Sequence, residues 1–236
     1  MDAIVTHTIS NFSELHQVIK ENCLIPSYWQ FRGQSDVSWS LVPRCARSPY
    51  KSRDDKRIFS EWKQEALDVV EHSPIDDWHW LALAQQHGLA TRLLDWSRNP
   101  LVAAFFASYE NMEKDGVIFA YLGSTVVLEQ SFAQSTPWEA KEPSIFRPSI
   151  KSRRVSNQSG QFTLSNEPLK CFTEQIRNSE KLFKLVIAKD YKKTLQLELA
   201  RYQIHWGTLF PDLDGHSKFC NWQIEYGEKY INNQSS

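Results

Sequence analysis

Three short polar clusters, far apart in the chain, contain the residues whose types could do chemistry. The first is Phe31-Arg32-Gly33-Gln34, which follows a short aromatic run that begins at Tyr28. An arginine at a strand end can present a fork of N–H donors to a phosphate or carboxylate, and a neighbouring glycine would let a ligand approach the backbone. The alternative is a surface arginine beside a turn glycine, which is the ordinary meaning of so short a motif.

The second cluster embeds polar side chains in the strongly apolar segment 84–103. Burial of such groups is costly unless each one finds a partner, so their density indicates a site. A purely structural interpretation pairs Arg92 with Asp95 and makes Ser97 a helix cap, but it does not explain the whole set. The polar members are His87, Thr91, Arg92, Asp95 and Ser97.

The third cluster, residues 153–162, contains Gln158 and Phe162 in a locally basic stretch. Clustered basic side chains can hold the phosphates of a nucleic acid, although a solvated loop would have the same composition. The candidate nucleic-acid contacts are Arg147, Lys151, Arg153 and Arg154.

Composition and charge limit the class of protein. The 236 residues are 41% hydrophobic, which is enough for a substantial core in one large domain. A net charge of −1 gives the whole chain no general attraction to nucleic acid. We expect no membrane span, no signal peptide and a cytoplasmic location, because no apolar run approaches about 18 residues and the first residues lack a basic region followed by an apolar one.

Neither cysteines nor carboxylates form a metal pattern. The four cysteines are scattered, with no CxxC or Cys/His spacing, so we expect reduced thiols and no structural zinc. Asp212-Leu213-Asp214-Gly215 is part of a calcium-loop pattern without the distal glutamate, and we expect a turn capped by its own aspartates. No metal is therefore predicted.

Hydrophobic spacing and capping residues predict the elements that position these clusters. The fold class is α+β, a single domain with N-terminal helices packed on a small mixed or antiparallel sheet. Its expected parts are an N-terminal helical segment over 1–27, a main domain over 28–217, and a C-terminal helix with a frayed tail over 218–236. Expected helices lie at 12–23, 56–72, 77–87, 100–109, 189–204 and 217–230, expected strands at 28–31, 116–123, 160–165 and 182–188, and a long loop at 124–153.

Taken together, four blocks of the sequence resemble the FRG domain, a family named for its (F/Y)RG motif. In order they are FRGQSDVSWSLVPR, ALAQQHGLATRLLDWSRNPLVAAFFA, RRVSNQSGQF and LFPDLDG, and they extend over about residues 28–217. The middle block is long and distinctive. The family name alone does not specify a reaction.

A more distant resemblance, to arginine-type mono-ADP-ribosyltransferases, implies a chemistry and an ADP-ribosyltransferase-like fold. These enzymes carry an arginine at the end of an early strand, a Ser-Thr-Ser strand that runs into a helix, and a loop with a catalytic glutamate. Arg32, the Asp95–Ser97 stretch and Gln158 lie in the corresponding places. The resemblance implies NAD as substrate and catalytic roles for Arg32, Asp95, Gln158 and His87. It implies NAD-binding roles for Arg32, Gly33, Gln34, Thr91, Arg92, Trp96, Ser97 and Phe162.

Three functions follow as hypotheses. The first is an NAD-dependent ADP-ribosyltransferase, a toxin or antiviral defence effector that modifies RNA, DNA or protein and has a neutralising antitoxin protein as partner. The second is a non-catalytic module that senses a nucleotide, favoured because Gln158 is uncharged and cannot act as a base. The third is a nuclease that uses His87 and Asp95, although metal-dependent nucleases normally need several clustered carboxylates.

Overall fold

The computed structural model describes residues 4–147 and 157–227, which form one α+β fold around a mixed eight-stranded sheet. The strand order is β1-β8-β4-β2-β3-β7-β6-β5. The strands are β1 (Thr6–Ile9), β2 (Gln30–Gln34), β3 (Leu93–Ser97), β4 (Gly116–Leu122), β5 (Val126–Val127), β6 (Ser144–Phe146), β7 (Gly160–Leu164) and β8 (Lys181–Ile187).

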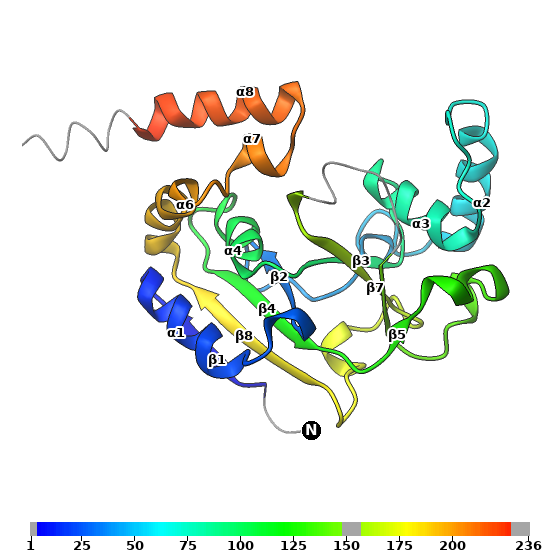
Figure 1. Ribbon diagram of the computed structural model, residues 1–236, viewed down its shortest axis with the longest axis horizontal. Coiled ribbons are helices and arrows are strands. Elements are labelled where there is room, and N and C mark those ends of the chain that lie inside the picture. The colour runs from blue at the N-terminus through cyan, green and yellow to red at the C-terminus, as the bar shows by residue number, and fades with distance from the viewer. Residues whose placement is uncertain (1–3, 148–156, 228–236) are drawn as a thin grey trace, which may run out of the picture.

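Helices lie at both ends of this sheet. Figure 1 shows α1 beside β1 and β8 at one end, and α2 and α3 near β3 and β7 at the other. In the described residues the α-helices are α1 (Phe12–Asn22), α2 (Asp55–Ala66), α3 (Asp77–Gln86), α4 (Pro100–Ser108), α6 (Lys192–Arg201), α7 (Trp206–Leu209) and α8 (Leu213–Trp222). Shorter 3-10 or π turns lie at Pro26–Tyr28, Arg44–Ala46, Glu129–Gln134, Pro137–Glu139, Phe172–Glu174, Lys189–Tyr191 and Gln223–Gly227. None of the helices in these described ranges is long and apolar enough to cross a bilayer.

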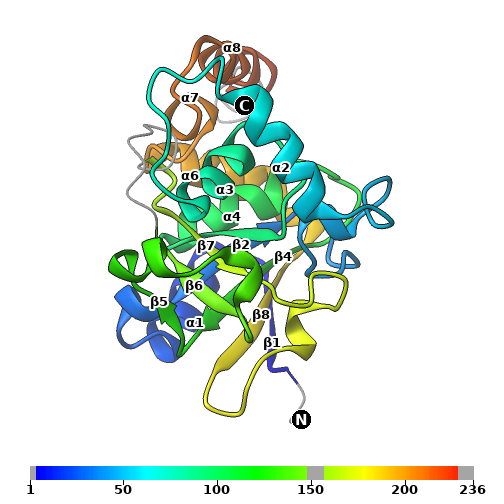
Figure 2. The same ribbon diagram turned by 90° about the vertical axis from the view of Figure 1, so that its right-hand side faces the viewer.

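Three apolar clusters hold the helices on the sheet. One packs α1, α4 and α6 against β2, β4 and β8, and a second packs α2 and α3 against β3, β6 and β7. The third lies on the remaining face, where Trp96, Phe119 and Tyr121 meet Leu41 and Phe172. Figure 2 shows the helices and the sheet from the side on which α2 and α3 lie. Residues of all three clusters line the site described below.

Capping residues begin α3 and α4, and a glycine ends α3, as expected. Asn99 caps α4 by accepting a hydrogen bond from the Leu101 N–H, and Pro100 occupies the first turn. Asp76 caps α3 through the His79 N–H, and Gly88 follows that helix with a φ of +87°. The end of α3 and the start of α4 lie on either side of β3, so these caps set the ends of the segment that carries the second polar cluster.

Several expected boundaries are wrong. The sheet is larger than expected, because the loop expected over 124–153 contains β5 and β6, and because neither β1 nor β3 is among the strands that the residue pattern predicts. A strand as short as β1 gives little periodic signal, and its partner β8 lies far away in the sequence. Likewise α2 ends at Ala66 rather than near residue 72, where the β-branched Val69 and Val70 follow. The expected frayed tail lies outside the described residues.

One feature of the sheet creates space for a ligand. Strands β2 and β3 are neighbours, but Phe31 and Ser97 form their one register pair. By contrast β2 pairs with β4 over five residues, and β3 pairs with β7 over five. The two central strands therefore diverge beyond Phe31 and Ser97, and the first and second polar clusters face each other across this fork.

Candidate functional site

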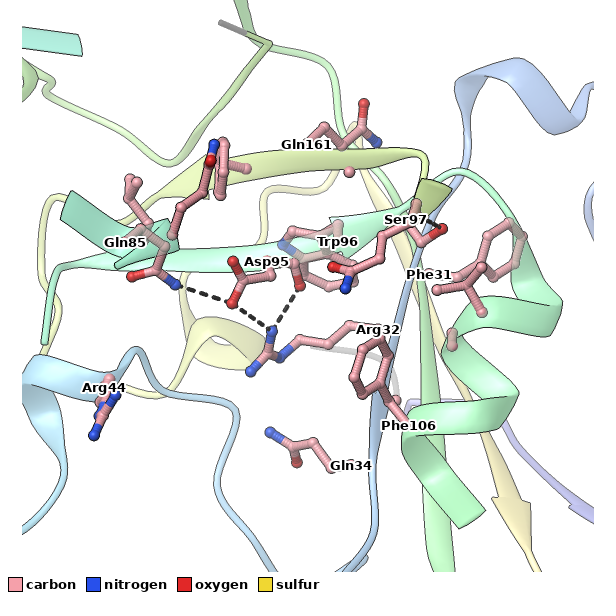
Figure 3. A pocket seen from close by; sticks show the side chains of 18 of the residues that line it. Phe31, Arg32, Gln34, Arg44, Gln85, Asp95, Trp96, Ser97, Phe106 and Gln161 are labelled. Carbon is pink, nitrogen blue, oxygen red and sulfur yellow. Dashed lines mark hydrogen bonds and ion pairs between the residues drawn. The ribbon is translucent and has the colours of Figure 1, made fainter. Parts of the chain in front are cut away.

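A cavity of about 400 Å³ lies at the fork between β2 and β3. This volume is within the range of small-molecule sites, roughly 300–1,000 Å³. Three clusters that are distant in the sequence converge there, as Figure 3 illustrates for its labelled members. The predicted site residues that line the cavity are Arg32, Gly33, Gln34, Asp95, Trp96, Ser97, Gln158 and Phe162.

Arg32 reaches across the fork from β2 to β3. Its Nη1 donates to the Asp95 carbonyl oxygen at 2.7 Å and lies 3.6 Å from the Asp95 carboxylate Oδ2. The Arg32 side chain is 16% exposed and that of Asp95 is 57% exposed. Burial lowers the pKa of the Arg32 guanidinium, and the Asp95 carboxylate opposes that shift. An arginine nevertheless stays protonated, so Arg32 places a fixed positive charge in the cavity, and its buried Nε has no protein partner.

A short relay of hydrogen bonds orients the Asp95 carboxylate. Gln85 Nε2 donates to Asp95 Oδ2 at 2.9 Å, and Thr91 Oγ1 donates to Gln85 Oε1 at 2.6 Å. Thr91 in turn accepts from the Leu93 N–H. Thr91 therefore acts behind the cavity wall rather than as the expected NAD contact. Gln85 is a site residue that the sequence-based candidates do not include. Its position as a polar residue at the start of the apolar segment could have indicated it.

Arg92 has a different partner from the one expected. The predicted pair between Arg92 and Asp95 is wrong, because Arg92 makes a two-pronged ion pair with Asp55 at 2.7 and 2.8 Å. Both side chains are nearly buried, at 12% and 14% exposed. Arg92 does not line the cavity, and its pair with Asp55 joins α2 to the start of β3.

Arg92→Met should therefore destabilise the protein without lowering the affinity of the cavity for a ligand. Loss of one partner leaves Asp55 nearly buried and unpaired, and we expect a loss of about 2–4 kcal/mol in the free energy of unfolding. Urea unfolding measures this loss, and a ligand titration on the folded variant measures binding. A change in affinity with unchanged stability would contradict the structural role.

His87 also lies away from the cavity. It is the C-cap residue of α3, its side chain is exposed, and it does not line the cavity. The expected role of His87 as a proton carrier therefore has no geometric support.

Ser97 and Gln158 join the second cluster to the third. Ser97 Oγ donates to the Gln158 carbonyl oxygen at 2.6 Å and accepts from the Asn99 N–H at 2.9 Å. Gln158 Nε2 donates to the Leu209 carbonyl oxygen at 3.0 Å, at the end of α7. The single hydroxyl proton of Ser97 is donated to the Gln158 backbone, and this bond holds the Gln158 loop beside the cavity.

Two expected ligand contacts have their rings in the core. The Trp96 ring lies 5.5 Å from the Tyr121 ring and 5.8 Å from the Phe172 ring, and its Nε1 donates to Thr163. Strand alternation turns Trp96 to the face opposite Asp95, and its indole packs in the third apolar cluster, with the residue 2% exposed where it lines the cavity. Phe162 is 4% exposed and stacks on Phe146.

Gly33 is required for packing rather than for ligand approach. A Cβ at this position would lie 1.9 Å from the Ala103 carbonyl oxygen and 2.6 Å from the Ala107 nitrogen. Helix α4 thus crosses β2 at a distance that only glycine permits. The expected ligand role of Gly33 is replaced by a role in holding α4 and the adjacent Arg32 in place.

Positive charge predominates around the cavity. Its charged lining residues are three arginines, Arg32, Arg44 and Arg47, and one carboxylate, Asp95. Arg44 donates to the Gly88 carbonyl oxygen at 3.0 Å, and Arg47 donates twice to that of Val42. Burial, and then the charge of Arg32, lowers the pKa of Arg47. This balance favours an anionic ligand such as a phosphate ester. The sequence around Arg44 and Arg47 does not mark them as site residues, because ordinary surface arginines have the same local pattern.

The expected nucleic-acid contacts are only partly described. Arg147 Nε donates to Gln161 Oε1 at 2.6 Å, next to the cavity. Lys151, Arg153 and Arg154 lie outside the described residues.

The described residues also contain no group of three or more His, Cys, Asp or Glu side chains placed to hold a metal ion. Asp212 caps α8 through the Gly215 N–H at 2.7 Å, so the segment expected as a self-capped turn is the start of a helix that begins at Leu213 and not near residue 217. The nuclease hypothesis therefore gains no support within this part of the chain.

The fold and site define an α+β protein with a cationic cavity at a fork in its sheet. Residues 27–116 match the family model described as the FRG domain. The match includes Arg32 and Asp95 and ends before Gln158. No curated protein and no solved structure matches the chain.

Proposed function

We propose that this FRG-domain protein binds NAD in the cavity at the fork and transfers its ADP-ribose group to a macromolecule. The observation that supports this proposal is the convergence of Arg32, Asp95 and Gln158 at one cationic cavity. Their order along the chain is the order that the sequence resemblance to arginine-type ADP-ribosyltransferases implies for the functional residues, although Arg32 lies in the middle of β2 and not at its end.

Arg32 is the proposed diphosphate contact. It is a fixed cation with an unpaired Nε, and its Nη1 is held by the Asp95 carbonyl oxygen. Arg44 and Arg47 add positive charge along the same cavity. A guanidinium fork matches the geometry of phosphate oxygens, and a partly buried setting strengthens the interaction.

Asp95 is the proposed catalytic carboxylate. In the transfer, the bond between the nicotinamide nitrogen and ribose C1′ breaks and its electron pair leaves with nicotinamide. The acceptor's nucleophile then bonds to C1′ and releases its proton. Positive charge develops on the ribose between these events, and a fixed carboxylate stabilises it. Asp95 is held by Gln85 but is still 57% exposed, so a ribose could reach it.

Gln158 is proposed to position the ribose rather than to carry charge. Its Nε2 is used by the Leu209 carbonyl oxygen, which leaves Oε1 as an acceptor for a ribose hydroxyl. The acceptor macromolecule is RNA, DNA or protein, and Arg147 beside the cavity is a candidate contact for nucleic-acid phosphates. Action as a toxin or defence effector, held in check by a neutralising protein, is part of the same proposal.

A second candidate is a non-catalytic module that senses NAD or a related nucleotide. The uncharged amide at Gln158 favours it, because a catalytic glutamate is replaced by a group that cannot act as a base. This candidate predicts saturable nucleotide binding and intact NAD after prolonged incubation.

The test uses NAD labelled in its adenylate phosphate, incubated with the purified protein and a cell extract, followed by separation of protein, RNA and DNA. We expect label in one fraction, and loss of that label with Arg32→Ala. Arg57→Ala is the matched control, because Arg57 lies on α2 with a side chain 73% exposed and does not line the cavity. Intact NAD with bound nucleotide would favour the sensing module. Transfer that survives Arg32→Ala would contradict the proposed site.

A further inference from the structure

Gln34 is a buried amide with no partner in the protein. Its side chain lies at the end of β2, lines the cavity, and the residue is 4% exposed. Both Oε1 and Nε2 are buried and without a hydrogen bond. A buried polar group of this kind is costly to the folded protein, so it indicates a partner that arrives from outside the chain.

Another glutamine of the same strand is unpaired at one amide atom instead of two. Gln30 lies on the same face of β2 and is 1% exposed; its Nε2 donates to the Tyr28 carbonyl oxygen at 2.7 Å, and its Oε1 is buried without a partner. Gln30 does not line the cavity. The glutamine with both amide atoms unpaired is thus the one that faces the ligand space.

The position of Gln34 relative to Arg32 indicates which part of a dinucleotide it meets. Arg32 and Gln34 are alternate residues of β2 and therefore project to the same side of the strand. In Figure 3 the Arg32 guanidinium lies between Asp95 on one side and Gln34 on the other. If the diphosphate binds Arg32 and the reactive ribose lies at Asp95, the adenosine half extends toward Gln34.

An exposed aromatic ring lies close to Gln34 in sequence and at the same cavity. Trp39 is 43% exposed, and it lines the cavity five residues after Gln34. Its backbone N–H donates to the Asp36 carbonyl oxygen, which closes the turn after β2. Exposed aromatic rings at a cationic groove commonly stack on nucleobases.

We propose that Gln34 and Trp39 form a subsite for the adenine ring of the nucleotide. The Gln34 amide donates through Nε2 to an adenine ring nitrogen and accepts through Oε1 from the adenine amino group, the two-pronged pairing that glutamine makes with this base. The Trp39 ring lies against the face of the base. This subsite rests on the proposed NAD function and specifies how the cavity distinguishes adenine from other groups.

Calorimetric titration of three ligands tests the subsite on the whole chain. The ligands are NAD, ADP-ribose, which lacks nicotinamide, and nicotinamide mononucleotide, which lacks adenosine. Gln34→Leu should lower the affinity for NAD and for ADP-ribose about tenfold or more, because it removes both hydrogen bonds to adenine. It should leave the affinity for nicotinamide mononucleotide unchanged. Trp39→Ala, at a position that is 43% exposed, should give the same pattern.

Gln30→Leu is the matched control, since it replaces a buried glutamine of the same strand outside the cavity. It should leave all three affinities unchanged. Thermal unfolding without ligand adds an independent readout. Gln34→Leu should raise the Tm, because it removes two unpaired buried amide atoms, whereas Gln30→Leu should raise it less or not at all, because it removes the bond to Tyr28 together with one unpaired oxygen.

The outcomes separate this subsite from the proposed function. If the wild-type protein binds NAD but Gln34→Leu lowers the affinity for none of the ligands, the proposed adenine subsite is wrong and the proposed NAD function stands. If Gln34→Leu lowers the affinity for nicotinamide mononucleotide instead, Gln34 contacts the nicotinamide half of NAD and the assignment to adenine is overturned. If wild-type protein binds none of the three ligands, both proposals fail.

Discussion

Gly33→Ala should cost the protein about 3 kcal/mol or more in its free energy of unfolding, which is a large fraction of the stability of an ordinary domain. The added Cβ would lie 1.9 Å from a backbone oxygen of α4, at Ala103. Backbone atoms of a buried helix cannot move aside as the tip of a flexible side chain can. Urea unfolding followed by circular dichroism measures the loss.

Gly88→Ala is the matched control for this steric argument. Gly88 has open space around its Cβ position, where the nearest atom is Arg44 Nη1 at 3.8 Å, but it has a φ of +87°. The substitution should therefore cost only the backbone strain, about 1–2 kcal/mol. Equal and small losses for the two variants would mean that α4 does not approach β2 as closely as described.

Asp95→Asn should reduce the rate of ADP-ribose transfer about 100-fold or more, which is the usual scale for loss of one fixed group that stabilises transition-state charge. Asparagine keeps the size of the side chain and an oxygen that can accept from Gln85. NAD affinity should not fall, because the substitution removes a negative charge from a cavity that binds an anion. Release of nicotinamide, measured by chromatography, gives the rate, and calorimetry gives the affinity.

Glu61→Gln is the control for charge removal in general. Glu61 lies on α2, its side chain is 61% exposed, and it does not line the cavity. It should leave both transfer and binding unchanged. Transfer by Asp95→Asn at the wild-type rate would remove Asp95 from the proposed chemistry, and a parallel loss of NAD binding would make Asp95 a binding residue instead.

The sequence was sufficient to predict the elements that local signals define. The Asn99-Pro100 start of α4 and the Gly88 end of α3 follow from capping chemistry that acts within a few residues. The convergence of Arg32, Asp95 and Gln158 was predicted through resemblance to known families, and the structure brings all three to one cavity.

Contacts between distant segments could not be predicted in the same way. No local pattern shows that Arg92 pairs with Asp55 and not with Asp95, which is nearer in the sequence. Either carboxylate could be brought to Arg92 by a plausible fold. The packing role of Gly33 depends on the path of α4, about 70 residues later in the chain. The fork between β2 and β3 is likewise a property of the assembled sheet, so the cavity itself has no sequence signature.

The central claim is that the cavity at the fork binds NAD through Arg32. The measurement that tests it most directly is a calorimetric titration of NAD into wild-type protein and into Arg32→Ala at one fixed salt concentration. We predict saturable binding of one NAD per wild-type chain, and a loss of affinity of about tenfold or more in Arg32→Ala, consistent with the loss of a charged hydrogen bond. No binding to the wild-type protein, or equal affinity for both proteins, would contradict this account.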